Sequence, residues 1–168
     1  ILDAVGKEGT KSGPEEAARN ILASWDYDMK RDSAAAALFG MTYQCLVKQL
    51  LHAPLGDELY QGFTAFGPAV SRLVKKVFLN GQKAWIGDQD PQSILTKSFK
   101  EAVRQGTKLL GSDLKRWQWG EIHRAEWRHP LAERSRFLEI LYDVGPMSYR
   151  GSEDTVDYSG WSLAYPYR

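Results

Sequence analysis

Two histidines beside two acids are the first residues in this sequence whose types could do chemistry. His123 and His129 lie close to Glu121 and Glu126. A zinc site on a helix places its ligands four residues apart, whereas these histidines are six apart and His52 is distant. The pattern favours imidazoles that are bonded to backbone or carboxylate groups, and we assign no metal ligand.

A phosphate-binding loop is the second chemistry that the residue types suggest. Residues 6–13 are rich in glycine and lysine and precede a helix start. Such a loop needs Gly-Lys-Ser or Gly-Lys-Thr in sequence, but Thr10 separates Gly9 from Lys11. We therefore interpret residues 1–13 as a linker.

Nucleophilic catalysis finds no support in the sequence. A serine nucleophile needs a base and an oxyanion hole, and the sequence has no Gly-x-Ser-x-Gly motif. An N-terminal nucleophile needs Ser, Thr or Cys as the first residue, but Ile1 has no nucleophilic side chain. Cys45 stands among apolar neighbours and is expected to be a small buried hydrophobe. We assign no catalytic, cofactor-binding or metal-binding residue.

Aromatic and basic residues alternate over residues 115–136, a composition that can bind single-stranded nucleic acid. Glutamates in the same segment dilute its charge, and the net charge of the chain is only +1. Packing of these side chains within the protein is therefore the favoured interpretation. No apolar run approaches the length of a membrane-spanning helix. We expect neither a nucleic-acid nor a membrane partner.

The elements that would position these residues are mostly helices. Ser12 and Pro14 start the first helix, Asp32 or Ser33 caps the second, and Asp90 with Pro91 starts the last long one. Glycine or proline interrupts the pattern between them. The predicted helices cover residues 14–25, 34–51, 57–62, 66–78 and 91–110, with a short capped turn after Asp113.

The character of the sequence changes after residue 113. Trp117 and Trp119 alternate as in a strand or an extended arm, and Thr155-Val156 is a small β-prone island. With 168 residues, the chain has the length of about one domain. We predict a mainly α fold, with a helical subdomain over 14–117 and an extended arm with short strands over 118–168.

Three segments, taken together, resemble the penicillin amidase family of N-terminal nucleophile hydrolases. Residues 22–39 are similar to the family's helix ending in Leu-x-x-Trp-Asp, followed by Asp-Ser and an alanine-rich helix. Residues 117–131 contain Trp-x-Trp-Gly-x-x-His and then His-Pro-Leu, the most specific match. Residues 151–157 resemble a glycine-rich turn that leads into a Thr-Val strand. Tyr27, Ala132 and Asp157 depart from the family pattern, so no subfamily is assigned.

The resemblance implies that this chain is a late segment of the large (β) chain of an αββα hydrolase. Such a parent cleaves N-acyl amides of penicillins, cephalosporins or acyl-homoserine lactones after processing itself into two chains. Its nucleophilic serine, oxyanion asparagine and calcium ligands would lie upstream of Ile1, and its compartment would be periplasmic or extracellular. The partner of this segment would be the remainder of the acylase, and the segment itself would hold no cofactor.

Two functions remain open from the sequence. The leading one is a structural helical segment of an acylase, inactive by itself, whose arm over Trp117–Leu131 fastens the helices to the catalytic core. In that picture His123 and the two tryptophans position neighbouring elements and do not react. The alternative is a free-standing helical module that binds another protein and catalyses nothing. Both ends of the chain, Ile1 and Arg168, are expected to be cut from a longer protein.

Overall fold

A computed structural model describes residues 13–65, 67–131 and 135–157 of the chain. The fold is mainly α, with an extended C-terminal part, as the sequence predicted. The elements in chain order are α2 (Pro14–Ala23), α3 (Ala34–Thr64), α4 (Gly67–Phe78), α5 (Pro91–Leu110), the 3-10 turn η1 (Leu114–Arg116), α6 (Trp119–Ile122), β1 (Arg124–Trp127), α7 (Arg136–Tyr142) and β2 (Val144–Ser148).

Two of the predicted helix caps are confirmed. The Ser33 hydroxyl accepts a hydrogen bond from the Ala36 amide at 3.1 Å, and a carboxylate oxygen of Asp90 accepts one from the Ser93 amide at 3.0 Å. Each bond satisfies an amide that the first turn of a helix leaves without a partner. Helix α2 begins after Gly13 without a side-chain cap. The predicted Ser12 cap and the rest of the linker over 1–12 lie outside the described residues.

The break that the sequence predicted at residues 54–56 is confirmed at Gly56, where non-helical backbone angles separate two helical parts of α3. The first part continues through Pro54, beyond its predicted end at residue 51. At Gly56 the backbone has a φ of +68°, a conformation that favours glycine. The predicted short helix at 57–62 is the part of α3 that follows this break.

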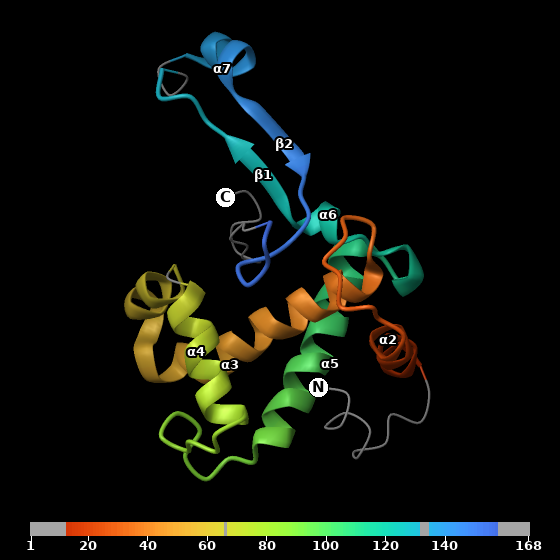
Figure 1. The fold of residues 1–168 in the computed structure, drawn as a ribbon, viewed down its shortest axis with the longest axis vertical. Coiled ribbons are helices and arrows are strands. Elements are labelled where there is room, and N and C mark those ends of the chain that lie inside the picture. The colour runs from red at the N-terminus through yellow and green to blue at the C-terminus, as the bar shows by residue number, and fades with distance from the viewer. Residues whose placement is uncertain (1–12, 66, 132–134, 158–168) are drawn as a thin grey trace.

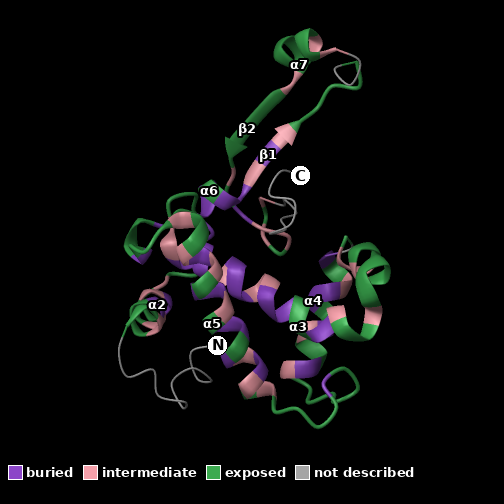
Figure 2. Cartoon of the chain, turned by 180° about the vertical axis from the view of Figure 1, so that it is seen from behind, coloured by how far each residue is buried: buried purple, intermediate pink, exposed green. Residues whose placement is uncertain are grey.

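The core is built along α3 and α5, which cross and pack against each other (Figure 1). One buried cluster joins α2, the first half of α3, the second half of α5, η1 and α6. A second joins residues 46–51 of α3 to α4, Ile86 and Ile94. Figure 2 shows the buried residues concentrated on these two long helices. Both helices therefore contribute to both clusters.

Two predictions for the C-terminal part were wrong, and one helix was missed. The Trp-x-Trp motif is extended only at Trp117 and Gln118, because Trp119 begins the one-turn helix α6. The strand comes later, at β1. Thr155 and Val156 lie in turns, where the Thr155 hydroxyl donates to the carbonyls of its own loop and does not join a strand. Helix α7 was not predicted at all.

Strands β1 and β2 form an antiparallel hairpin that carries α7 and extends away from the helices (Figure 1). Arg124 pairs with Ser148 and Trp127 with Val144, with an irregularity between Ala125 and Trp127. We call residues 124–148 the arm. Within the described residues, no helix is long and apolar enough to cross a membrane.

Candidate functional site

The Trp-x-Trp motif at the base of the arm seats its two indoles on glycines of the two long helices. A Cβ at Gly40 of α3 would overlap the Trp119 ring, with Cη2 at 2.8 Å, and a Cβ at Gly106 of α5 would overlap the Trp117 ring, with Cζ2 at 3.0 Å. Both indoles are almost completely buried. Only residues without a side chain allow such a close approach, so these glycines set the position of the motif.

Backbone carbonyls satisfy both buried indole N–H groups. Trp117 Nε1 donates to the Gly111 carbonyl and Trp119 Nε1 donates to the Gly151 carbonyl, each at 2.9 Å. The Gly151 amide in turn donates to the Met29 carbonyl at 2.9 Å. Trp119 therefore joins α3 to the turn at 151–157, which is distant in the sequence.

His123 lies at 0% exposure between the rings of Trp119 and Tyr149. Its Nδ1 is 3.1 Å from the Tyr149 carbonyl oxygen. Because a carbonyl only accepts, Nδ1 carries the proton of this hydrogen bond. The Tyr149 amide returns a bond to the His123 carbonyl at 2.9 Å. These contacts hold the two strands of the arm together where they leave the helices.

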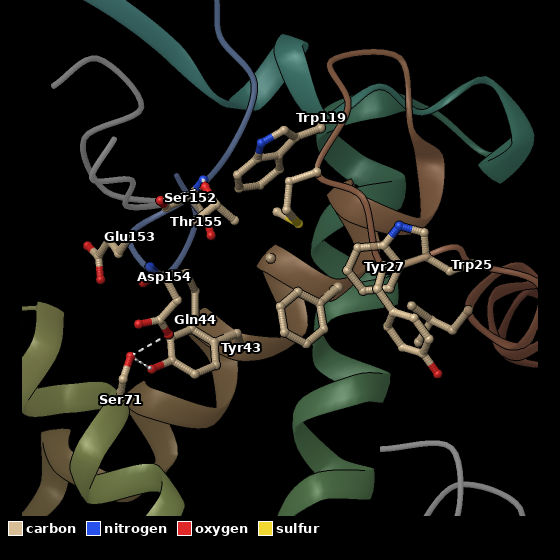
Figure 3. Close-up of a pocket in the computed structure, with 14 residues that line it drawn as sticks. Trp25, Tyr27, Tyr43, Gln44, Ser71, Trp119, Ser152, Glu153, Asp154 and Thr155 are labelled. Atoms are coloured by element: carbon tan, nitrogen blue, oxygen red, sulfur yellow. Dashed lines mark hydrogen bonds between the residues drawn. The ribbon is translucent and has the colours of Figure 1, made fainter. Parts of the chain in front are cut away.

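An open pocket of about 670 Å³ lies beside Trp119 (Figure 3). Its walls come from the α2–α3 connection, α3, α4, α6 and the turn at 151–157. Most of its lining is aromatic or aliphatic, with a polar edge on the side of that turn. The lining residues are Leu22, Trp25, Tyr27, Met29, Phe39, Gly40, Tyr43, Gln44, Ser71, Trp119, Ser152, Glu153, Asp154 and Thr155.

The apolar wall of the pocket contains a row of four rings. The centroids of Tyr27 and Trp25 are 5.5 Å apart, those of Trp25 and Phe39 are 5.1 Å apart, and those of Phe39 and Tyr43 are 6.3 Å apart. Such separations are typical of favourable aromatic pairs. Trp25 Nε1 donates to the Asp28 carbonyl at 3.0 Å, which fixes the ring that stands second in the row, between Tyr27 and Phe39.

The polar edge is a directed chain of hydrogen bonds. Ser71 Oγ donates to a carboxylate oxygen of Asp154 at 2.8 Å, and Tyr43 Oη lies 3.3 Å from the same hydroxyl (Figure 3). Since the single Ser71 proton points to Asp154, the bond between the two hydroxyls needs Tyr43 as its donor. Burial raises the pKa of Tyr43, and the charge of Asp154 raises it further, so Tyr43 keeps its proton.

The described lining of the pocket can accept an apolar or aromatic group. Among the described lining residues, none is a histidine, lysine or cysteine. The Ser71 hydroxyl is directed to a carboxylate, which is a weak base, and not to an imidazole or amine. The chain of bonds ties α4 to the turn at 151–157.

The remaining sequence candidates lie apart from the pocket. His52 Nε2 is 2.8 Å from a carboxylate oxygen of Asp57, and Nδ1 of the exposed His129 accepts from the Leu131 amide at 3.2 Å. The expected backbone or carboxylate partners are thus confirmed, although only His123 is buried. Within the described parts of the chain, no three His, Cys, Asp or Glu side chains gather as metal ligands would.

Cys45 is buried, as predicted, and burial raises the pKa of its thiol to about 11. The glycine-rich stretch at 6–13 lies outside the described residues except for Gly13. The sequence did not single out Gly40, Ser71 or Asp154. The one signal for Ser71 was a small polar residue within the otherwise apolar stripe of α4.

The described residues form a mainly α protein whose long helices are joined through the buried side chains of a Trp-x-Trp-Gly-x-x-His motif. The sequence profile of the penicillin amidase family matches residues 1–168, and the chain belongs to that family. The family predicted from three short motifs is therefore confirmed over the whole chain.

Similar proteins are acylases from Pseudomonas. Acyl-homoserine lactone acylase QuiP of Pseudomonas syringae pv. tomato is 31% identical over 175 residues, which cover 95% of this chain and 20% of that protein. QuiP of Pseudomonas aeruginosa is 28% identical, covering 95% and 21%. Penicillin acylase 2 proenzyme of Pseudomonas sp. is 27% identical, covering 95% and 20%. The chain thus spans about a fifth of the length of these relatives.

Proposed function

We propose that this chain is a structural helical segment of an acylase that hydrolyses N-acyl amide bonds, and that it does not catalyse hydrolysis by itself. The substrates of the complete enzyme would be acyl-homoserine lactones or the amide side chains of β-lactams, as the names of the relatives suggest. The observation that carries the proposal is the family match over the whole chain, together with its span of about a fifth of the relatives.

The site geometry supports a structural role. The Trp-x-Trp-Gly-x-x-His motif packs inside the protein. Both indoles and the imidazole are buried, and each donates a hydrogen bond to a backbone carbonyl. In the proposed enzyme, the nucleophile, its base and the oxyanion donors come from the remainder of the acylase, as in an N-terminal nucleophile hydrolase. By the same resemblance, the complete enzyme binds calcium outside this segment and works in the periplasm or outside the cell.

The proposal is tested by comparing the purified chain with the complete acylase polypeptide encoded by the same gene. Each is incubated with acyl-homoserine lactones of several chain lengths and with a chromogenic phenylacetyl amide. We expect turnover by the complete polypeptide and none by the chain alone. Turnover by the chain that survives repurification would contradict the structural role, and inactivity of the complete polypeptide on every substrate would contradict the acylase.

The exposed apolar arm also fits the second candidate, a free-standing module that binds another protein. Phe137 and Ile140 in α7 are 68% and 78% exposed. An open reading frame that encodes only this segment, together with capture of a separate protein through the arm, would favour the module. A reading frame that continues into an acylase would favour the proposed segment.

A further inference from the structure

The outer part of the arm exposes more large apolar side chains than any other part of the described structure. Helix α7 has no buried residue, and every residue of β2 is exposed (Figure 2). The large apolar residues of the arm that are exposed are Trp127, Leu131, Phe137, Ile140, Leu141, Tyr142, Val144 and Met147. Such a concentration of exposed apolar side chains is typical of an interaction site in a folded protein.

The arm lacks the packing that its own elements need. A helix of seven residues is marginal in water, and most helices are stabilised by packing of an apolar face. A two-stranded hairpin is also marginal alone, and within the described residues β1 and β2 pair only with each other. A partner would supply the missing contacts to both the helix and the open strand edges.

The base of the arm, by contrast, is fixed to the helices. Ala125 is buried, His123 is packed between rings, and Trp119 bonds the Gly151 carbonyl. Figure 1 shows the arm leaving the helices at α6 with α7 at its far end. The exposed surface is thus held at a set position and does not fold back onto the chain that carries it.

The charges of the arm favour a protein partner. Its described residues hold three arginines (Arg124, Arg128 and Arg136) and three acids (Glu126, Glu139 and Asp143), so its formal charge is 3 − 3 = 0. Membrane-surface helices and nucleic-acid sites need an excess of cations. An apolar surface with balanced charges instead resembles the interior of a protein–protein interface.

We propose that the outer arm, defined by the described residues 127–131 and 135–147, is the surface by which this segment docks onto the remainder of the acylase polypeptide. The inference rests on the proposed function. The remainder of the same polypeptide is the occupant that the relatives favour, because they carry the matching segment within one protein about five times longer, and about four-fifths of that protein is left to cover the arm. The sequence placed the attachment surface at Trp117–Leu131. Because Trp117 and Trp119 are buried within this segment, the surface that remains free to dock lies farther out along the arm.

The test compares amide hydrogen exchange in the isolated chain and in the complete acylase polypeptide. We expect amides of residues 136–148 to exchange about tenfold or more slowly in the complete polypeptide, because burial closes the local opening of the arm. Amides in the middle of α3 should change less, since this helix is already packed in the chain.

Matched variants test whether the slower amide exchange of residues 136–148 depends on the apolar surface of the arm. Ile140 and Leu79 are equally exposed, at 78%, but Leu79 lies beside α4 and outside the arm. In the complete polypeptide, Ile140→Asp should remove the added protection of residues 136–148, whereas Leu79→Asp should leave it. Phe137→Asp is the second arm variant, and circular dichroism of each isolated chain checks that the helices still form.

The outcomes separate this inference from the proposed function. If the complete polypeptide hydrolyses acyl amides but the arm exchanges as fast as in the isolated chain, the docking surface is overturned and the acylase stands. If the arm is protected but no acyl amide is hydrolysed, the acylase fails and the docking stands. If the amides of residues 136–148 become protected in the isolated chain as its concentration rises, a second copy of the chain covers the arm. That result would overturn the proposal.

Discussion

At the scale of single residues, Gly40 allows Trp119, at the base of the arm, to pack closely against α3. The Trp119 ring occupies the space of a Cβ at this position. We expect Gly40→Ala to lower the free energy of unfolding by about 1–3 kcal/mol, the usual cost of overpacking a core. Urea denaturation followed by circular dichroism measures the change.

The control for Gly40 is another glycine of the same helix. A Cβ at Gly62 would meet no atom within 4 Å. Gly62→Ala should therefore raise the free energy of unfolding by about 0.5–1 kcal/mol through helix propensity. Equal effects of the two substitutions would show that the contact with Trp119 does not limit position 40.

The buried thiol of Cys45 gives a prediction on pH. Burial, with a smaller contribution from Glu101, raises its pKa from 9.0 to about 11. The folded state therefore holds the proton more tightly than the unfolded state, so its contribution to stability is complete below about pH 9 and is lost as the pH rises towards 11. Urea midpoints measured from pH 8 to 11 should fall more steeply for the natural protein than for Cys45→Ala.

Tyr43 and Tyr60 also have raised pKa values and are present in both proteins. Burial is the main cause for both, and only the smaller contribution of Cys45 to the pKa of Tyr60 is lost in the variant. Thiol reactivity gives an independent readout. At pH 8 a disulfide reagent should modify Cys45 slowly in the folded protein and rapidly in urea, because the thiolate is the reactive form. Fast modification of the folded protein would contradict a protonated, buried thiol.

At the scale of elements, the N-caps of the long helices are local features with a measurable contribution. Asp90 bonds the Ser93 amide at the start of α5. Asp90→Ala should cost about 1 kcal/mol of stability, a typical loss for a capping acid. Asp88, two residues earlier and exposed, makes no such bond in the structure, so Asp88→Ala should change the urea midpoint little. A loss of similar size in both variants would assign the effect to charge and not to the cap.

Elements whose boundaries are set by nearby residues could be predicted from the sequence. Ser33, Asp90 and Asp113 each cap a helix or turn through a side chain that bonds an amide two or three residues later. The apolar stripe of α4 is likewise a local pattern, and its Val70, Leu73 and Val77 are buried as expected. Such signals need no knowledge of the rest of the fold.

The elements that were missed depend on distant contacts. Trp119 begins a helix because its ring must reach Gly40 and its N–H must reach Gly151, and neither residue is near it in the sequence. The pocket edge joins Ser71 to Asp154 over 83 positions. Helix α7 is the exception among the missed elements, because none of its residues is buried and packing against the long helices does not explain it.

At the scale of the whole molecule, α3 is the element through which the two buried clusters depend on each other. Met41 belongs to the cluster that holds Trp117 and Trp119, whereas Leu50 belongs to the cluster with α4. Helix α5 provides a second connection, with Phe99 in the first cluster and Ile94 in the second. Coupling between the clusters would hold the arm in place, because clusters that opened separately would let it move.

The last prediction tests whether the two clusters unfold as one unit. Leu50→Ala should cost about 2–5 kcal/mol, as large-to-small changes in a core do. If α3 transmits the loss, the slowest amides around Met41 and Phe99 should lose the same free energy of protection as those around Leu50, measured by native-state hydrogen exchange. Leu59→Ala, at a site 65% exposed beyond the bend at Gly56, is the matched control and should change neither group. Loss of protection confined to α4 and residues 46–51 would mean that the two clusters unfold as separate units. Only the unit that contains Trp117 and Trp119 would then carry the arm.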